Sequence, residues 1–567
     1  MFLATSRCLA QSSAASPATL SGPRREFVIH HHYLNLPIQN GAPKRKVTVF
    51  VDGQETVKLD IELAGAAADW WAPMDVRAWQ GRQVVLQVDQ LPADSAALEN
   101  IEPSDEIRDA GNLYHESLRP QFHFSPKRGW NNDPNGLVFY RGEYHLFFQH
   151  NPYGLGWGNM HWGHATSRDL VHWQEQGDVL APDQFGPMFS GSAVVDWPNT
   201  SGFGLAGQPA QVLVYTACGS PAVQCLAYST DGRNYTKFSG NPVVKQIAGG
   251  NRDPKVRWYE PERKWIMVLY VGFEDSSQPG AKGRAGRRDT IQFLSSTNLK
   301  DWTVMSEMEG FYECPDFFPL PDPADPAKVK WVLTAASSDY MVGAFDGAKF
   351  TPETPKLKGH CGRGYYAPQT FSDLPVKDGR RIQIGWFQSE TRGMPFNQCM
   401  SIPLALSLRS TPEGARLDWQ PAKELELLRG KSWLCGAFTL KPGDANPSAE
   451  AKGELLEVRA GFAPGGHTAI SFAVRGVPIN YDSGKEVLSV CGISTRAPLL
   501  QGRQEIIIYA DRTSLEVFAS DGLVYVPTPA IPKPENQAVE TSVMGDPVKF
   551  NHLEVYRLRS IYGSAGL

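Results

Sequence analysis

The residues most able to do chemistry in this chain lie in 130–136 (WNNDPNG). Pro134 has a fixed φ and disfavours the helical region for Asp133, so this carboxylate sits on a stiff turn that Asn135 and Gly136 complete. Aromatic residues surround the turn in the sequence, at Trp130, Phe147, Phe148, Trp157 and Trp162. An acid held beside aromatic planes suits sugar chemistry, in which a carboxylate attacks or shields a cationic carbon. The alternative is an Asx-Pro turn that only joins two strands.

Two further acidic residues stand next to proline in a similar way. Asp253 belongs to 251–254 (NRDP), and Glu313 belongs to 313–316 (ECPD). A proline directly after the acid, or one residue later, suits the end of a strand more than its middle. Three acids in such settings favour an active site over an isolated turn, provided that the fold brings them together.

Short recurring strands are the elements that must position these acids. Five similar apolar segments start about 60 residues apart, at 144–149 (YHLFFQ), 212–217 (VLVYTA), 265–270 (WIMVLY), 331–336 (WVLTAA) and 382–387 (IQIGWF). A second pattern, Ser-x-Asp/Asn-x-x-x-aromatic, follows three of them, at 167–173, 229–235 and 296–302. Four short strands with their turns take roughly 40 to 60 residues, so this period predicts a five-bladed β-propeller over 116–425. A β-sandwich or barrel with accidental similarity is the alternative.

The order of the acids agrees with the propeller. Asp133, Asp253 and Glu313 precede the first, third and fourth of the recurring segments. Each is therefore expected in the strand that enters a blade, and the first strand of every blade lines the central channel. Three acids from three blades should then converge on one funnel.

The composition argues against several classes of function. The 567 residues carry 55 basic and 60 acidic side chains, a net charge of −5, without a long run of one sign, which argues against nucleic acid and for a neutral partner. No apolar stretch approaches the roughly 20 residues of a membrane helix. The 8 cysteines show no CxxC or zinc-like spacing, so neither a metal nor another cofactor is expected. Cys218 and Cys225 could close a small disulfide loop or remain free thiols.

The segments that flank the propeller predict further β-structure. Residues 1–25 are rich in Ala and Ser and fit a weak or truncated secretory signal, or a disordered segment. Residues 26–115 predict a small β-rich module with an acidic linker, and 426–567 lose the blade period and predict a β-sandwich. Residues 30–32 (HHH) lead into an apolar stretch without a fourth ligand nearby, so no metal site is expected there.

The three acidic motifs resemble those of the invertase, inulinase and levanase family of glycoside hydrolases, which act on β-fructofuranosides. The nucleophile motif of that family is matched by 132–136 (NDPNG), its Arg-Asp-Pro motif by 252–254 and its Glu-Cys-Pro motif by 313–315. The resemblance extends over about 112–558. One departure is Asn131, where the family usually has a larger apolar residue, often Met. We expect this change to tune the pocket wall without removing activity.

The resemblance implies a role for each acid. Asp133 would be the nucleophile and Glu313 the general acid/base of a retaining hydrolysis, with their carboxyl groups about 5 to 5.5 Å apart. Asp253 would bind sugar hydroxyls and stabilise the transition state, kept ionised by Arg252. Apolar neighbours, together with Asp133, would keep Glu313 protonated. The residues alone support three converging acids and do not assign these roles.

Substrate-binding residues are expected around the acids. The candidates are Asn132, Gln149, Trp157, Phe189, Ser190, Arg252 and Trp386. Asn132 and Gln149 would hydrogen-bond fructose hydroxyls, Ser190 would form a polar edge, and the two tryptophans would form apolar walls. Each aromatic residue taken singly could equally belong to the core.

The resemblance therefore implies an all-β glycosidase, secreted or periplasmic, that releases terminal fructose from levan or inulin and from sucrose. The pattern 189–193 (FSGSA) is closer to bacterial fructan hydrolases than to plant sucrose enzymes. A non-catalytic fructan-binding protein on the same scaffold and a fructosyltransferase are the alternatives. Neither nucleic acid nor a membrane is an expected partner, and the residues do not indicate an oligomeric state.

Overall fold

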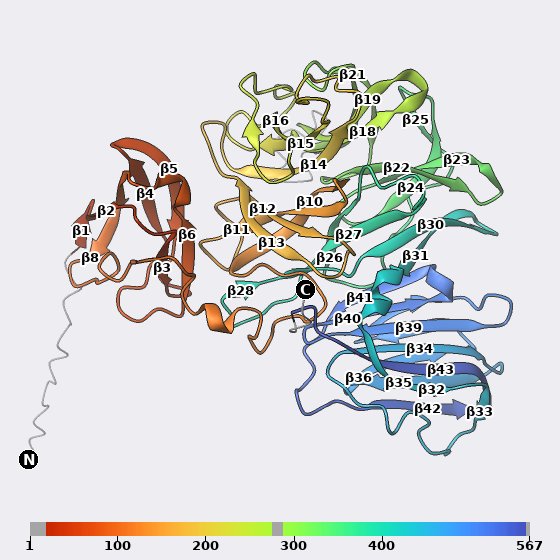
Figure 1. Ribbon diagram of the computed structural model, residues 1–567. Coiled ribbons are helices and arrows are strands. Elements are labelled where there is room, and N and C mark those ends of the chain that lie inside the picture. Colours follow the sequence, from red (N-terminus) through yellow and green to blue (C-terminus); the bar gives the residue numbers. More distant parts are fainter. Residues whose placement is uncertain (1–18, 275–286, 563–567) are drawn as a thin grey trace, which may run out of the picture. The chain divides into compact units, whose positions relative to one another are not determined.

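The computed structural model describes residues 19–274 and 287–562. These residues fall into two compact units, which lie within Met1–Ala110 and Gly111–Leu567 (Figure 1). The described residues contain strands and short 3-10 helices only, which confirms the all-β expectation. The helices are η1 (Arg77–Trp79), η2 (Ala110–Asn112), η3 (Glu260–Glu262), η5 (Lys423–Leu428) and η6 (Ser520–Gly522). None of the helices in the described ranges has the length and apolar character that crossing a membrane requires. Residues 1–18 of the expected signal segment lie outside these ranges.

The first unit is made of short antiparallel sheets with alternating burial. Its strands, sheet by sheet, are β1 (Thr19–Ser21) and β8 (Gln90–Pro92); β2 (Arg24–Val28), β7 (Gln83–Val88), β4 (Arg45–Val51) and β5 (Gln54–Ile61); and β6 (Trp70–Asp75), β3 (Tyr33–Ile38) and β9 (Glu102–Ser104). Val47, Val49 and Val51 alternate along β4 and are at most 2% exposed. This period of two is typical of a strand with one face in a core. The strands of this unit agree with the β-rich character expected for 26–115.

The second unit begins with five consecutive antiparallel sheets. The first sheet contains β10 (Gly129–Tyr140), β11 (Glu143–Asn151), β12 (His161–Ser167), β13 (Gln174–Leu180) and β28 (Phe396–Asn397), and the second contains β14 (Met188–Asp196), β15 (Ala210–Ala217), β16 (Val223–Ser229) and β17 (Thr236–Lys237). The third contains β18 (Arg252–Tyr259), β19 (Lys264–Glu274), β20 (Arg287–Ser296) and β21 (Thr303–Glu309), and the fourth contains β22 (Asp316–Asp322), β23 (Asp325–Thr334), β24 (Tyr340–Phe345) and β25 (Phe350–Pro352). The fifth contains β26 (Tyr365–Thr370), β27 (Arg381–Phe387), β30 (Leu404–Thr411), β31 (Gly414–Pro421) and β29 (Cys399–Met400). The five recurring segments lie in β11, β15, β19, β23 and β27, each the second strand of its sheet, as their register predicted.

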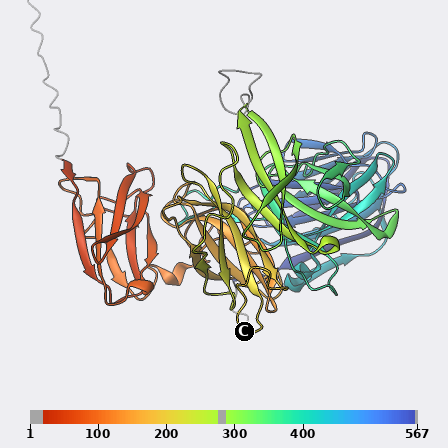
Figure 2. The same ribbon diagram turned by 90° about the horizontal axis from the view of Figure 1, so that it is seen from above.

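The first strands of these sheets follow one another around a ring. β10 contacts β14 and β26, β14 contacts β18, and β26 contacts β22. Between β18 and β22 the Arg257 side chain donates to the Phe317 carbonyl at 3.2 Å. The ring closes where β28, which follows the fifth sheet's second strand, pairs in parallel with β10 through Gly129 and Trp130. Figure 2 shows the successive sheets of this unit from above. Sheets that meet along their first strands are the arrangement of a β-propeller.

The remainder of the second unit consists of two packed sheets. The larger contains β32 (Arg429–Cys435), β33 (Phe438–Leu440), β43 (Val548–Leu558), β34 (Leu456–Ala463), β39 (Gln504–Ala510), β40 (Ser514–Ala519) and β41 (Val524–Pro529); the smaller contains β38 (Ile493–Arg496), β37 (Val487–Val490), β36 (Val477–Asp482), β35 (Thr468–Val474) and β42 (Val539–Gly545). Apolar residues from both sheets, among them Val458, Ile508, Phe472 and Ile479, form one buried cluster. The two sheets therefore share a core.

A buried charged group joins the ring of sheets to the larger of these two. His123 Nδ1 lies 2.8 Å from Asp511 Oδ2, and His123 Nε2 lies 2.8 Å from Glu516 Oε1, with all three side chains fully buried. The backbone N–H groups of Gln121 and Phe122 also donate to Asp511. The two carboxylates raise the pKa of His123 to about 9 against the opposing effect of burial. The imidazolium form of His123 is therefore part of the folded structure at neutral pH.

Candidate active site

Asp133 lies in an irregular part of β10. The pairing of β10 with β11 shifts between Asn131 and Pro134, so Asp133 falls in a bulge, where a proline can be accommodated in a strand. Gly136 follows with a φ of +53°, and a Cβ at this position would lie 2.7 Å from Phe147 Cδ2. The turn therefore requires glycine for both its conformation and its close contact. This local geometry leaves the Asp133 side chain partly exposed.

Three donors hold the Asp133 carboxylate, one from β14, one from the turn before β22 and one from β10 itself. Ser190, at the start of β14, donates its hydroxyl to Asp133 Oδ2 at 2.6 Å. Cys314 Sγ lies 3.3 Å from the same oxygen, and Asn132 Nδ2 donates to Oδ1 at 3.3 Å. Burial raises the pKa of Asp133, and the charge of Glu313 adds to this rise, while the hydrogen bonds oppose it. The donors therefore favour the ionised form that a nucleophile needs.

Asp253 occupies the corresponding position in β18, two sheets further on. Its φ of +66° belongs to the left-handed region, which Asp tolerates better than most residues, and its N–H donates to Thr216 Oγ1 at 2.9 Å. Its carboxylate is buried and accepts a hydrogen bond from the backbone N–H of Cys314 at 3.0 Å. Burial raises the pKa of Asp253 to about 7, with Glu313 and Asp133 adding to the rise and Arg252 opposing it.

Glu313 lies in the turn before β22. The sequence predicts Glu313 within the first strand of a blade, but that strand begins three residues later, at Asp316, so this prediction is wrong. Glu313 and Cys314 have φ values of +40° and +43°, so the chain bends sharply there and cannot continue as a strand. Tyr366 donates its hydroxyl to Glu313 Oε1 at 2.5 Å, and Arg252 Nη2 donates to Oε2 at 2.8 Å. Positive φ at three residues of one site is the kind of backbone strain that folded proteins retain at functional positions.

Cys314 connects the three acids. Its sulfur lies 3.3 Å from Asp133 Oδ2 and 3.5 Å from Asp253 Oδ2, and its chain neighbour is Glu313. Burial raises the pKa of the Cys314 thiol well above its usual range, and the carboxylates raise it further. The residue therefore remains a neutral thiol that can donate to the carboxylates. Three acids that are far apart in the sequence thus meet around one side chain.

Arg252 interacts differently from the sequence expectation. Its guanidinium lies 2.8 Å from Glu313 and 3.6 Å from Asp253, and it packs over the rings of Tyr270 and Tyr312. Arg252 lowers the pKa of Asp253, as expected, but burial and the two other acids outweigh its charge, so that the pKa is raised to about 7. The expected apolar surroundings of Glu313 are wrong, since this carboxylate is held by a cation and a phenol.

Aromatic residues stand beside the acids. Trp386 packs edge-on against Trp130, at 5.8 Å between ring centroids, and against Tyr366, at 6.1 Å. Trp157 is 58% exposed and packs edge-on against Phe189, which directly precedes Ser190. The exposed face of Trp157 and the partly exposed Trp386 agree with their predicted place at an apolar wall.

The remaining predicted site residues are buried. Asn132 accepts from the Trp130 indole N–H at 3.1 Å, which fixes it beside Asp133. Gln149 is 2% exposed. When the Asn135 amide is oriented so that both its oxygen and its nitrogen have hydrogen-bond partners, Gln149 Nε2 donates to the Asn135 oxygen at 3.1 Å. Asn131 is fully buried, with no partner for either side-chain polar atom among the described residues. It does not line a pocket wall, and that expectation is corrected.

Sequence reasoning missed Tyr366 and Thr216. Tyr366 lies in β26, the strand that enters the fifth sheet, so it occupies the same kind of position as Asp133 and Asp253. The repeat could therefore have indicated it. Thr216 is the penultimate residue of the recurring segment in β15, and its contact with the Asp253 backbone depends on a left-handed turn that the sequence does not predict. Within the described ranges Cys218 and Cys225 are free thiols, and no group of three or more His, Cys, Asp and Glu side chains is placed to hold a metal ion.

The chain is similar to known proteins in sequence and in structure. Residues 123–421 match the family described as glycosyl hydrolases family 32 N-terminal domain. A levanase of Bacillus subtilis (strain 168) is 38% identical over 503 residues, which covers 80% of this chain and 72% of the levanase. Invertase 1 of Saccharomyces cerevisiae is 35% identical over 347 residues, 56% of this chain and 61% of the invertase. Among solved structures, the exo-inulinase from Aspergillus awamori has a TM-score of 0.68 at 27% identity, covering 79% of this chain and all of the inulinase chain.

Proposed function

The chain belongs to glycosyl hydrolase family 32 and is a glycosidase, and from this premise we propose that it is a retaining β-fructosidase. It releases terminal β-D-fructofuranosyl units from levan or inulin, and from sucrose. The observation that carries the proposal is the meeting of Asp133, Asp253 and Glu313 around Cys314 and Arg252. A binding protein would not need three carboxyl groups at such close range, where Glu313 raises the pKa of both Asp133 and Asp253.

Asp133 is the nucleophile in this proposal. It attacks the anomeric carbon of the fructosyl unit while Glu313 transfers its proton to the departing glycosidic oxygen, so the bond to the leaving group breaks as the covalent fructosyl-enzyme forms. Water then attacks the same carbon, Glu313 removes a proton from the water, and Asp133 is released as a carboxylate. The Ser190 hydroxyl at 2.6 Å supports the role of Asp133 because a donor stabilises the anion before and after the reaction.

Asp253 stabilises the oxocarbenium-like transition state and binds sugar hydroxyls. Asp253 lies close to Asp133 and Glu313, and burial together with their charges raises its pKa to about 7. A fructose hydroxyl that donates to Asp253 favours its ionised form. This anion then stabilises the positive charge that develops on the sugar.

The proposal extends to the domain organisation and the substrates. The five sheets are the blades of a five-bladed propeller over 116–425, the two packed sheets form a β-sandwich over 426–567, and 26–115 is a separate β-rich module. The names of the similar levanase, invertase and exo-inulinase support fructans and sucrose as substrates. Secretion is supported by a similar protein from Aspergillus niger that is named an extracellular exo-inulinase.

Fructose release from levan, inulin and sucrose, measured side by side, tests the function. We expect hydrolysis of all three, with higher kcat/KM on a fructan than on sucrose. Equal or greater efficiency on sucrose would contradict the fructan preference alone. Reducing-sugar release by the wild type and by Glu313→Gln tests catalysis itself. If both proteins are equally inactive while fructan still binds, the chain is a fructan-binding protein, and product analysis at high sucrose would identify a fructosyltransferase.

A further inference from the structure

A second polar pocket lies at the opposite end of the strands that carry the acids. Its volume is about 300 Å³, and it is lined by Val194, Arg257 and Thr370 among others. Each of these residues lies four positions further along β14, β18 or β26 than Ser190, Asp253 or Tyr366. At about 3.3 Å per strand residue, this pocket lies roughly 13 Å from the acids. It is therefore distinct from the candidate active site.

Two arginine side chains in this pocket are charged without a carboxylate partner. Arg257 Nη1 donates to the Phe317 carbonyl at 3.2 Å, and Arg381 Nη1 donates to the Phe371 carbonyl at 3.0 Å. The Nε atoms of both arginines are buried with no partner, and neither guanidinium forms an ion pair with any of the described residues. Burial lowers the pKa of Arg257 to about 9, the charge of Arg381 lowers it further, and the more distant carboxylates of Asp316 and Asp373 oppose this fall. Two such cations repel each other across a small polar space.

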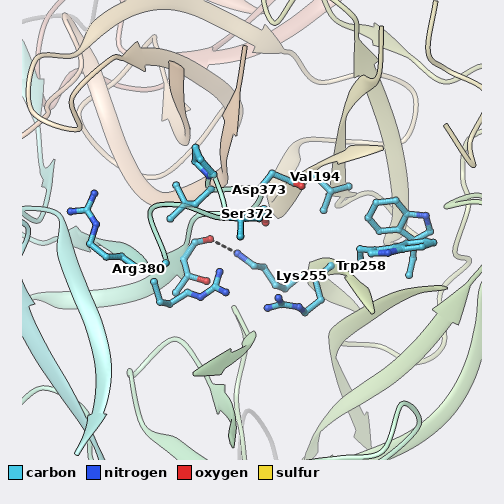
Figure 3. A pocket seen from close by; sticks show the side chains of 14 residues that line it. Val194, Lys255, Trp258, Ser372, Asp373 and Arg380 are labelled. Atoms are coloured by element: carbon cyan, nitrogen blue, oxygen red, sulfur yellow. Dashed lines mark hydrogen bonds between the residues drawn. The ribbon is translucent and has the colours of Figure 1, made fainter. Parts of the chain in front are cut away.

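Lys255 adds a third cation to the same wall. Its side chain is 4% exposed, and its Nζ donates to the Thr370 carbonyl at 2.6 Å, as the dashed line in Figure 3 shows. Its nearest carboxylate is that of Asp316, 3.5 Å away, which also accepts from two backbone N–H groups. The other acid of the pocket, Asp373, accepts from Val195 N–H and the Trp197 indole. Both acids are thus already hydrogen-bonded to neutral donors and do not fully neutralise the three cations.

Arg380 provides an internal contrast. It lines the same pocket but forms paired hydrogen bonds with both Asp378 and Glu424, at 2.6 to 2.9 Å. Its guanidinium lies on the far side of the pocket from Lys255 (Figure 3). This charge is compensated within the chain, whereas those of Arg257 and Arg381 are not. A planar guanidinium presents paired N–H groups that match the oxygens of phosphate, sulfate or carboxylate.

We propose that this pocket binds one small oxyanion, with inorganic phosphate as the reference ligand, between the guanidinium groups of Arg257 and Arg381 and the ammonium group of Lys255. The anion neutralises the buried ammonium of Lys255 and the partly buried guanidinium groups of Arg257 and Arg381, whose charges are otherwise costly. It also links β18 to β27, at the ends remote from the acids. Its expected effect is stabilisation of the fold rather than a change in the chemical step.

Phosphate binding to the full-length chain tests this proposal. Equilibrium dialysis with radiolabelled phosphate should give about one site per chain. Millimolar phosphate, compared with sodium chloride at equal ionic strength, should raise Tm saturably by roughly 1 to 3 °C. Parallel titrations with sulfate and with acetate distinguish tetrahedral from planar oxyanions. Arg381→Gln should weaken phosphate binding at least tenfold, while the matched variant Arg380→Gln should retain it. Arg257→Gln provides a second test if Arg381→Gln does not fold.

The kinetics of fructose release separate this pocket from the acids. Phosphate at saturating concentration should leave the KM for sucrose unchanged in the wild type. The proposal is refuted if the wild type binds no phosphate, or if Arg380→Gln and Arg381→Gln lose binding equally. It is also refuted if phosphate competes with sucrose and Arg381→Gln does not alter the competition, because the anion would then be bound near Arg252. None of these outcomes depends on the proposed roles of the three acids.

Discussion

The buried group formed by His123, Asp511 and Glu516 should make the stability of the larger unit depend on pH. The folded state raises the pKa of His123 to about 9, from about 6.5 in an unfolded chain. Because the folded state binds the His123 proton more tightly than the unfolded chain does, the charged histidine contributes its full stabilisation below pH 6.5. This contribution is lost as the pH rises through 9. A shift of this size corresponds to about 3 kcal/mol. The lowered pKa of Asp511 acts at the acid end, where stability is lost as the pH falls below about 4.

This magnitude can be converted into a melting temperature. An unfolding entropy of about 2.1 cal/mol/K per residue over Gly111–Leu567 turns 3 kcal/mol into a fall in Tm of roughly 3 °C between pH 6.5 and 9. His123→Gln removes the cation and leaves two buried carboxylates without their partner, which costs about 3 to 5 kcal/mol at pH 6. The variant should therefore melt several degrees lower at pH 6, and the difference from the wild type should narrow towards pH 9.5.

Differential scanning calorimetry of both proteins from pH 5 to 9.5 checks this prediction. His172→Gln is the matched control, because His172 is a half-exposed histidine that pairs with Asp169 on the surface. It should follow the wild type at every pH. Parallel Tm curves for wild type and His123→Gln between pH 6.5 and 9 would refute the reasoning, since the histidine would then not be charged in the folded state.

Three substitutions near Asp133 give further tests. Asn131→Leu removes a buried amide without partners, so the free energy of unfolding in denaturant should rise by about 1 to 3 kcal/mol while fructose release persists. A fall in the free energy of unfolding would contradict this. Ser190→Ala removes the donor at 2.6 Å and should lower kcat/KM about tenfold or more while moving its acid limb to higher pH, since the pKa of Asp133 rises. Cys314→Ala removes a weaker donor to Asp133 and Asp253 and should move the acid limb of the kcat/KM profile to higher pH by a smaller amount than Ser190→Ala does. A larger shift than that of Ser190→Ala would contradict the assignment of Ser190 as the stronger donor.

The repeating pattern of strands could be predicted from the sequence because it depends on local residues. Each recurring segment is an apolar run of strand-forming residues at a regular period, and all five lie in the second strand of a sheet. Proline marked Asp133 and Asp253 as strand-end residues, and both lie at bulges of first strands. Glu313 could not be placed in its turn, because neither Glu313 nor Cys314 is a residue type that announces a positive φ.

The electrostatic partners of the acids could not be predicted from neighbours in the chain. Arg252 precedes Asp253, yet the left-handed turn at Asp253 leaves the guanidinium closer to Glu313, 61 residues away. The hydroxyl of Tyr366 donates to Glu313, although Tyr366 belongs to the fifth sheet and Glu313 precedes the fourth. Such contacts depend on how the sheets close into a ring, which no local pattern specifies. Asn131 was misplaced for the same reason, since its burial depends on the face of β10 that the bulge selects.

The central claim is that Asp133, and no other acid of the site, bonds to the fructosyl unit. The most direct measurement is mass spectrometry of Glu313→Gln after incubation with an aryl β-D-fructofuranoside, whose good leaving group departs without a general acid. The missing base slows release of the intermediate, so peptide mapping should find one anhydrofructosyl unit on the peptide that contains Asp133. A fructosyl unit on Asp253, or product of inverted configuration without any covalent adduct, would contradict the account.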